Sequence, residues 1–223
     1  MVFDDGTVRW GGLEQADIPR LPDPTAFAYR NVSAGTYHNL AVLSDGSLRG
    51  WGWNALGQAS IPLNLTGSFR KVEAGWVHSV ALRDDGQVFA WGSNVGGRCN
   101  VPPLPPGIVY TDIAASESHT VAIRSDGRAV SWGYNIQGEG NIPIPPPGVS
   151  YTDIAVDYSK TVLLRSDGVV VCLGDSSSGQ LNVPVPPAGV RYVDVAACRF
   201  SSFALRSDGR VVAWGIDALA SPP

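Results

Sequence analysis

Three histidines occupy one position of a repeated pattern, and histidine is a common metal ligand and proton-transfer group. They are His38, His78 and His119, spaced by 40 and 41 residues. A zinc site needs three or four ligands within ~2.0–2.3 Å of one ion. Residues that recur once per repeat lie on separate structural units. We therefore expect structural histidines, hydrogen-bonded to the backbone, and predict no metal site.

A second ionisable set, Asp112, Asp153 and Asp194, recurs in the pattern Tyr-x-Asp-(Ile/Val)-Ala. Two carboxyl groups act as general acid and base when their environments separate their pKa values. Copies of one repeat position should share one environment, and the same position holds Asn31 and Lys71 in earlier copies. We expect these aspartates to satisfy backbone groups or solvent at strand ends, without a catalytic role.

Nucleophilic and phosphate-binding motifs are weak. Ser-Asp-Gly recurs near the histidine position, but the chain has no Gly-x-Ser-x-Gly elbow. The segment Gly92-Ser-Asn-Val-Gly-Gly97 opens no predicted helix, so it lacks the helix N-terminus of a phosphate cradle. Cys172 and Cys198 replace small residues, and Cys99, in a loop, is the thiol best placed to react. We predict no catalytic residue, no cofactor and no enzyme.

Composition excludes several other classes. The 223 residues carry a net charge of −4 and no basic run, which argues against nucleic-acid binding. No apolar stretch approaches the ~18 residues of a membrane-spanning helix. The first residues, Met1 to Gly6, lack the regions of a signal peptide. This favours the cytoplasm, although an excised fragment of a secreted protein would look the same.

The chain is built from a repeat of about 40 residues. Asp-Gly occurs at 5–6, 45–46, 85–86, 126–127, 167–168 and 208–209. Trp-Gly follows at 10–11, 51–52, 91–92, 132–133 and 214–215, and Leu173-Gly174 stands in the remaining copy. Such a period indicates one supersecondary unit copied along the chain.

Each unit is predicted to be β structure. The runs His119–Arg124 and Arg128–Gly133 flank an Asp-Gly turn, which is a strong hairpin signal. Tyr110–Ala115 is predicted as the strand before this hairpin, and a fourth strand is expected near Ile61-Pro62 and Val101-Pro102. Short strands with periodic Gly and Trp are typical of propeller blades, with the Trp packed between blades.

The sequence therefore predicts an all-β fold, a β-propeller of about 40-residue blades with five full units and a partial one. We expect a single repeat domain over residues 1–223. Its units are a partial unit at 1–31 and then 32–71, 72–111, 112–152, 153–193 and 194–223.

These motifs resemble the repeats of the regulator of chromosome condensation (RCC1) family. The resemblance rests on Ala34-Gly35-Thr-Tyr-His38, on Ala74-Gly75-Trp-Val-His78-Ser-Val-Ala-Leu82 and on Trp91-Gly92-Ser-Asn94. The short repeats are similar to those of the bacterial propeller-type inhibitor of class A β-lactamases. Family members do unrelated jobs, so the resemblance implies the fold more strongly than the function.

The copy number departs from the family, whose propellers usually have seven blades. We expect a part of a longer propeller, an open array, or a ring closed with partners. Open ends would expose unpaired strand edges and promote self-association. The later units also drift: the glycine position becomes Ser116, Asp157 and Cys198, and the histidine position becomes Lys160 and Ser201.

Aromatic residues gather at two variable positions between the glycine and histidine positions. Rotated copies should place them on one side of the disc, and aromatic residues with Arg are typical of binding hot spots. In the resembling inhibitor, loops of this face carry aromatic contacts. We predict protein contacts at Tyr37, Trp76, Tyr158, Arg199 and Phe200, with Trp53 and Tyr134 in a second group. The alternative is that some rings cap the channel or wedge between blades.

The leading hypothesis is a non-enzymatic protein-binding propeller, an inhibitor or interaction scaffold that binds neither nucleic acid nor membrane. The resemblance implies a β-lactamase or a cell-wall transpeptidase as one partner. The alternative is nucleotide exchange on a small GTPase, as in the eukaryotic family member, although its basic nucleosome-contacting segment is missing here. Light sensing ranks third. The segment Gly75-Trp76-Val-His78 is similar to a Gly-Trp-Arg-His motif of the plant ultraviolet-B receptor, but it lacks the Arg and occurs only once.

Overall fold

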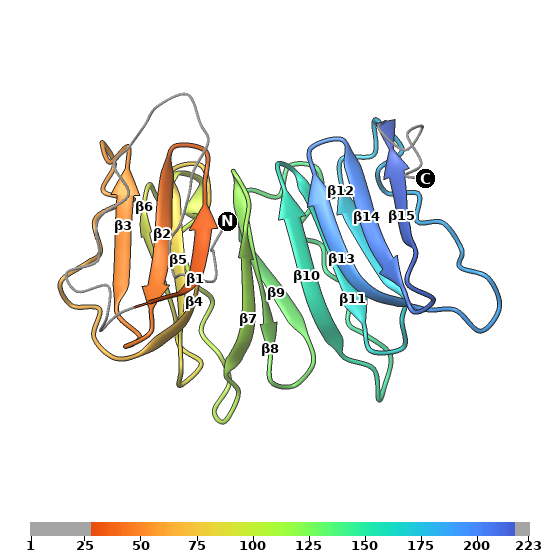
Figure 1. Cartoon of the computed structure of the whole chain (residues 1–223), viewed down its shortest axis with the longest axis horizontal. Coiled ribbons are helices and arrows are strands. Elements are labelled where there is room, and N and C mark those ends of the chain that lie inside the picture. The colour runs from red at the N-terminus through yellow and green to blue at the C-terminus, as the bar shows by residue number, and fades with distance from the viewer. Residues whose placement is uncertain (1–27, 217–223) are drawn as a thin grey trace.

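The computed structural model describes residues 28–216, which fold into five three-stranded antiparallel sheets. Each sheet is one blade, made from three consecutive strands, and we number the blades 1 to 5 along the chain. Figure 1 shows the blades side by side, with blade 1 and blade 5 at opposite ends. The all-β prediction is confirmed, and the arrangement is that of an open or incomplete propeller. The helical element within 28–216 is a short 3-10 turn (Val95–Gly97).

The strands recur with the period of the sequence. The first strands are β1 (Tyr29–Ala34), β4 (Phe69–Ala74), β7 (Tyr110–Ala115), β10 (Tyr151–Asp157) and β13 (Tyr192–Cys198). The second strands are β2 (His38–Leu43), β5 (His78–Arg83), β8 (His119–Arg124), β11 (Lys160–Arg165) and β14 (Ser201–Arg206). The third strands are β3 (Leu48–Gly52), β6 (Val88–Gly92), β9 (Ala129–Gly133), β12 (Val170–Gly174) and β15 (Val211–Gly215).

The Asp-Gly dipeptides form the hairpin turns between second and third strands, as predicted. In blade 1, Gly46 has φ of 81°, a conformation that glycine adopts without a steric penalty. The Asp45 carboxylate accepts a hydrogen bond from the Ser47 N–H at 2.9 Å. The turn thus supplies both the backbone freedom and the polar partner that a tight reversal needs.

The first strands of neighbouring blades lie next to each other, which makes them the inner strands of the propeller. Each begins with a β-bulge, between Tyr29 and Asn31 in β1 and at the equivalent positions in β4, β7, β10 and β13. A bulge leaves one residue outside the ladder of the sheet. Polar side chains at the bulges therefore become available for contacts between blades.

The core lies between blades. Leu40 and Val42 of blade 1 pack against Phe69, Val72 and Trp91 of blade 2, and similar clusters join the other blades. The Trp-Gly tryptophans contribute an indole N–H as well. The Trp91, Trp132 and Trp214 Nε1 groups donate to the carbonyls of Gln58, Arg98 and Gln180 in the preceding blade at 2.8–2.9 Å. The predicted packing of these tryptophans between blades is confirmed.

The fourth strand is a wrong prediction for residues 28–216. The segments around Ile61 and Val101 connect blades without joining a sheet. They are rich in proline, which has no N–H to donate to a ladder. The predicted unit boundaries stay predictions, and each boundary after residue 31 falls inside a first strand. No helix in the described range is long and apolar enough to cross a membrane.

Candidate functional site: a loop face with two aromatic patches

The turns between first and second strands lie at one end of all five blades. The loops that follow the third strands are held at the same end. The Trp53 N–H donates to the Tyr37 carbonyl at 2.8 Å, and the Tyr134 N–H donates to the Ser118 carbonyl at 3.1 Å. We call the surface formed by these turns and loops the loop face. It carries every residue that the sequence predicts as a protein contact.

Tyr37, Trp53 and Trp76 form an aromatic patch across blades 1 and 2. The Tyr37 and Trp53 rings meet edge to face with centroids 5.7 Å apart, and the Tyr37 and Trp76 centroids lie 6.5 Å apart. All three side chains are 42–52% exposed. Aromatic pairs at these separations stabilise each other by about 0.5–1.5 kcal/mol. The patch is therefore an ordered apolar surface open to solvent.

A second patch, Tyr158, Arg199 and Phe200, crosses blades 4 and 5. The Arg199 guanidinium lies 4.6 Å from the Tyr158 ring centroid and 5.4 Å from that of Phe200. Tyr158 has φ of 45°, in the left-handed region that non-glycine residues rarely adopt. The Ser116 and Ser118 hydroxyls of blade 3 both donate to its carbonyl, at 3.2 and 2.9 Å. These contacts hold the Tyr158 backbone, and the ring contacts Arg199.

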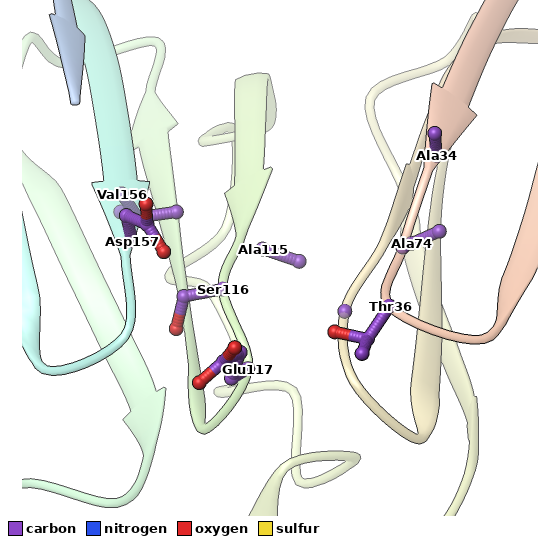
Figure 2. A pocket seen from close by; sticks show the side chains of 10 residues that line it. Ala34, Thr36, Ala74, Ala115, Ser116, Glu117, Val156 and Asp157 are labelled. Carbon is purple, nitrogen blue, oxygen red and sulfur yellow. The ribbon is translucent and has the colours of Figure 1, made fainter. Parts of the chain in front are cut away.

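A pocket of about 330 Å³ opens on this face between the ends of the inner strands. Figure 2 shows its walls: small side chains such as Ala34 and Ala74, with Thr36 on one side and Glu117 and Asp157 on the other. Burial raises the pKa of Glu117, and the nearby Asp157 carboxylate raises it further. Burial also raises the pKa of Asp157. The pocket is thus small-walled and acidic on one side.

Neither pocket carboxylate is among the predicted contacts. Glu117 occupies one of the two variable positions but is not aromatic, and Asp157 stands where blades 1 and 2 have Gly35 and Gly75. The replacement of glycine was the signal in the sequence that indicated this site. A charged side chain does not fit the close packing around the glycine, so it has to point into open space.

Tyr134 differs from the other predicted contacts. Its ring is half-buried, with the Arg98 guanidinium 5.1 Å from the centroid. A Cβ added to Gly96 would lie 2.7 Å from this ring. Tyr134 thus packs against the loop of the preceding blade. Its predicted role in protein contact stays a prediction.

The histidines join blades. The Nε2 atoms of His38, His78 and His119 lie 2.7, 3.0 and 2.9 Å from the side-chain hydroxyls of Ser79, Thr120 and Thr161 in the next blade. The Nε2 partners are therefore hydroxyls of the following second strand, and the expected backbone hydrogen bond is present at His119, with Tyr158. Among residues 28–216, no three His, Cys, Asp or Glu side chains gather as a metal site.

The aspartates of the inner strands do not share one environment, so that expectation is wrong. The Asp112 carboxylate accepts a hydrogen bond from the Lys71 ammonium, with 2.7 Å between Oδ1 and Nζ. Asp153 instead faces the next aspartate of the series, Asp194, and burial together with this neighbour raises the pKa of Asp153 to about 6. The residue on the adjacent blade sets the environment, and that residue varies between copies.

Comparison with known proteins agrees with this geometry. The family model for the regulator of chromosome condensation (RCC1) repeat matches residues 29–58, 69–98 and 110–139. These segments are blades 1 to 3 with the loops that follow their third strands. A comparison with curated protein sequences finds no relative.

Three solved structures share the fold. Human WBSCR16 superposes with a TM-score of 0.70 at 20% identity, over 84% of this chain and 61% of that one. Yeast RCC1 (Prp20) bound to Kap60 gives 0.74 at 20% identity, over 89% and 59%. Prp20p from Saccharomyces cerevisiae, described with its binding to Gsp1p and histones, gives 0.74 at 21%, over 89% and 61%.

The chain spans about three fifths of the length of these structures. Blades 4 and 5, outside the matched segments, repeat the strand order of blades 1 to 3. Three segments of the chain thus match the RCC1 repeat model, and the described residues share the propeller fold of these structures as an open row of five blades.

Proposed function

We propose that the chain is a non-enzymatic binding module that holds a protein partner on its loop face. The observation that carries this proposal is the pair of ordered aromatic patches, Tyr37–Trp53–Trp76 and Tyr158–Arg199–Phe200, on one face. Interface hot spots are enriched in Trp, Tyr and Arg. Rings already held by their neighbours lose little freedom on binding, which favours affinity.

The aromatic contacts of the resembling bacterial inhibitor make a class A β-lactamase or a cell-wall transpeptidase the first partners to test. Nucleotide exchange on a small GTPase is the second candidate. Its support is the likeness to yeast Prp20p, whose solved structure is described with binding to Gsp1p and histones. This likeness is one of fold, so the exchange activity needs a direct assay.

The test is a binding titration of the purified chain against a class A β-lactamase, a penicillin-binding transpeptidase and a Ran-type GTPase, with GDP release followed for the last. We expect one of these proteins to bind. Truncating Trp76 or Arg199 to Ala should then weaken the complex at least about tenfold, since a hot-spot side chain contributes about 2 kcal/mol or more.

Val169→Ala is the matched control. Val169 is 45% exposed, similar to the patch residues, but follows the Asp-Gly turn at the other end of the blades. It should leave the affinity unchanged. Absence of binding to all three proteins, or equal affinity of the Trp76 and Arg199 variants, would contradict the proposal.

We also propose that the open ends of the propeller support self-association. Blade 1 and blade 5 lie at opposite ends of the described row (Figure 1). Size exclusion with light scattering on the full chain distinguishes the cases. A discrete oligomer or a broad distribution supports open ends, and a clean monomer near 23.5 kDa opposes them.

A further inference from the structure

The bulges of the inner strands bring polar side chains to the blade junctions, and their contacts differ from one junction to the next. At the junction of blades 1 and 2, the Val72 N–H donates to the Asn31 side-chain carbonyl at 2.9 Å. At the junction of blades 2 and 3, the Lys71 ammonium donates to the Asp112 carboxylate at 2.7 Å. The first of these contacts joins neutral groups, and the second joins opposite charges.

The junction of blades 4 and 5 instead joins two acids. The Val195 N–H lies 3.1 Å from Asp153 Oδ2 and 2.9 Å from Asp194 Oδ1. Two carboxyl oxygens that accept from one N–H must lie close to each other. Asp153 Oδ1 is already occupied by the Ile154 N–H at 2.8 Å. One oxygen of each acid therefore faces the other across the junction.

Other charged groups around β10 are engaged elsewhere. Asp112 on β7 pairs with Lys71. On β11, Lys160 Nζ donates to two blade 5 carbonyls and Arg165 pairs with Asp167. On β8, Arg124 pairs with Asp126 and the buried His119 contacts Thr161. Asp157, at the end of β10 itself, lies in the pocket wall.

The raised pKa of Asp153 agrees with this geometry. Burial is the largest cause of the raised Asp153 pKa of about 6, and the hydrogen bond and charge of Asp194 act in the same direction. Two carboxylates in contact cannot both ionise without repulsion, which favours the protonated form of Asp153.

We propose that Asp153 and Asp194 form a single proton-binding site, in which a proton shared between Asp153 Oδ2 and Asp194 Oδ1 fastens blade 5 to blade 4. Loss of the proton leaves two negative charges at the inner strands and loosens the junction. The Tyr158–Arg199–Phe200 patch crosses the same junction at the other end of the inner strands. The proton site itself does not depend on whether the loop face binds a protein.

The sign of the effect follows from the direction of the shift. A carboxyl group with a raised pKa binds its proton more tightly in the folded chain than in the unfolded chain. The stabilisation is complete below the ordinary carboxyl range and is lost as the pH rises through about 6. The junction should therefore be tighter at pH 5 than at pH 7.

The test is an NMR titration of the Asp153 carboxyl carbon and the Val195 amide in the full chain from pH 4 to 8. The expected midpoint for both signals is near 6. In Asp194→Asn, which keeps the shape of the side chain, the midpoint should fall, because the hydrogen bond and the charge of Asp194 no longer raise the pKa of Asp153.

Asp85→Asn is the control, because it removes a carboxylate that pairs with Arg83 in blade 2, away from the junction of blades 4 and 5. It should leave the Asp153 midpoint where it is in the wild type. A wild-type midpoint near the ordinary aspartate value, or an unchanged midpoint in Asp194→Asn, would overturn the proposal.

Hydrogen exchange of the β13 amides measures the mechanical consequence. The buried histidines change the stability of the wild type and of Asp153→Asn alike between pH 5 and 7, so the ratio of the two exchange rates isolates the acid pair. The exchange rate of the wild type relative to that of Asp153→Asn should rise between pH 5 and 7, because the amide of the variant is neutral at both pH values. A ratio that does not change with pH would show that the pair does not control the junction.

Discussion

Lowering the pH from 7 to 5 should destabilise the chain strongly, because its three histidines are buried without charge. Burial lowers the pKa of His38 and His119 to about 4 and that of His78 to about 3. In the unfolded chain each returns to about 6.5. Between these values the unfolded chain binds more protons than the folded chain, so stability falls as the pH falls.

The size of the effect follows from the same values. At pH 5 each histidine removes about 2 kcal/mol from the free energy of unfolding, and the three together remove about 6 kcal/mol. The Asp153–Asp194 pair acts in the opposite direction. Because Asp153 is partly exposed, solvent screening limits its contribution to about 1 kcal/mol or less. The histidines therefore dominate, and their sum is comparable to the 5–15 kcal/mol stability of a typical domain.

The assay is urea unfolding followed by tryptophan fluorescence at pH 7 and pH 5. His78→Gln removes one titrating group and keeps a polar side chain near Thr120. Between pH 7 and pH 5, the free energy of unfolding of this variant should fall by about 2 kcal/mol less than that of the wild type. Equal wild-type stability at pH 7 and pH 5 would refute the reasoning, as would an unchanged pH dependence in His78→Gln.

Two further variant pairs test the packing by urea unfolding. Trp132→Phe leaves a buried carbonyl of the preceding blade without its 2.8 Å indole donor and should cost about 2 kcal/mol, whereas Trp53→Phe on the exposed loop face should change stability by less than about 0.5 kcal/mol. Equal effects would show that the indole hydrogen bond contributes nothing. Gly75→Ala places a Cβ 2.4 Å from a histidine ring and 2.5 Å from a backbone carbonyl, so it should cost about 3 kcal/mol or more. Gly107→Ala meets no atom within 4 Å and should cost only the left-handed backbone strain, about 1 kcal/mol. A Gly75→Ala protein as stable as Gly107→Ala would contradict the steric argument.

The sequence predicts the fold well because the repeat states each local rule several times. Asp-Gly turns, flanking β-branched residues and the Trp-Gly position identify the hairpins, and the strand Tyr110–Ala115 has the predicted bounds. The extra strand failed because Ile61 and Val101 lie beside prolines, and a ladder needs N–H donors that proline lacks.

Contacts between blades were harder to predict, because they join residues about 40 positions apart. The partner of His78 is Thr120, one unit further on, and nothing near His78 in the chain indicates a hydroxyl there. The environment of Asp153 likewise depends on residue 194. These contacts can be predicted only when equivalent positions of consecutive units are compared with each other.

Departures from the repeat can preserve the scaffold while changing its chemistry. Lys160 replaces the histidine of blade 4, yet its ammonium still reaches the next blade, where it donates to the Cys198 and Ser201 carbonyls at 2.7 and 2.5 Å. The junction is kept, but a neutral ring has become a buried cation. The same blade carries Asp157 at the glycine position and a strained Tyr158 beside it. These departures gather in blades 4 and 5, which lie outside the matched repeats. If the loop face binds a protein as proposed, we expect its specificity to lie in these two blades, because their side chains differ most from the repeat.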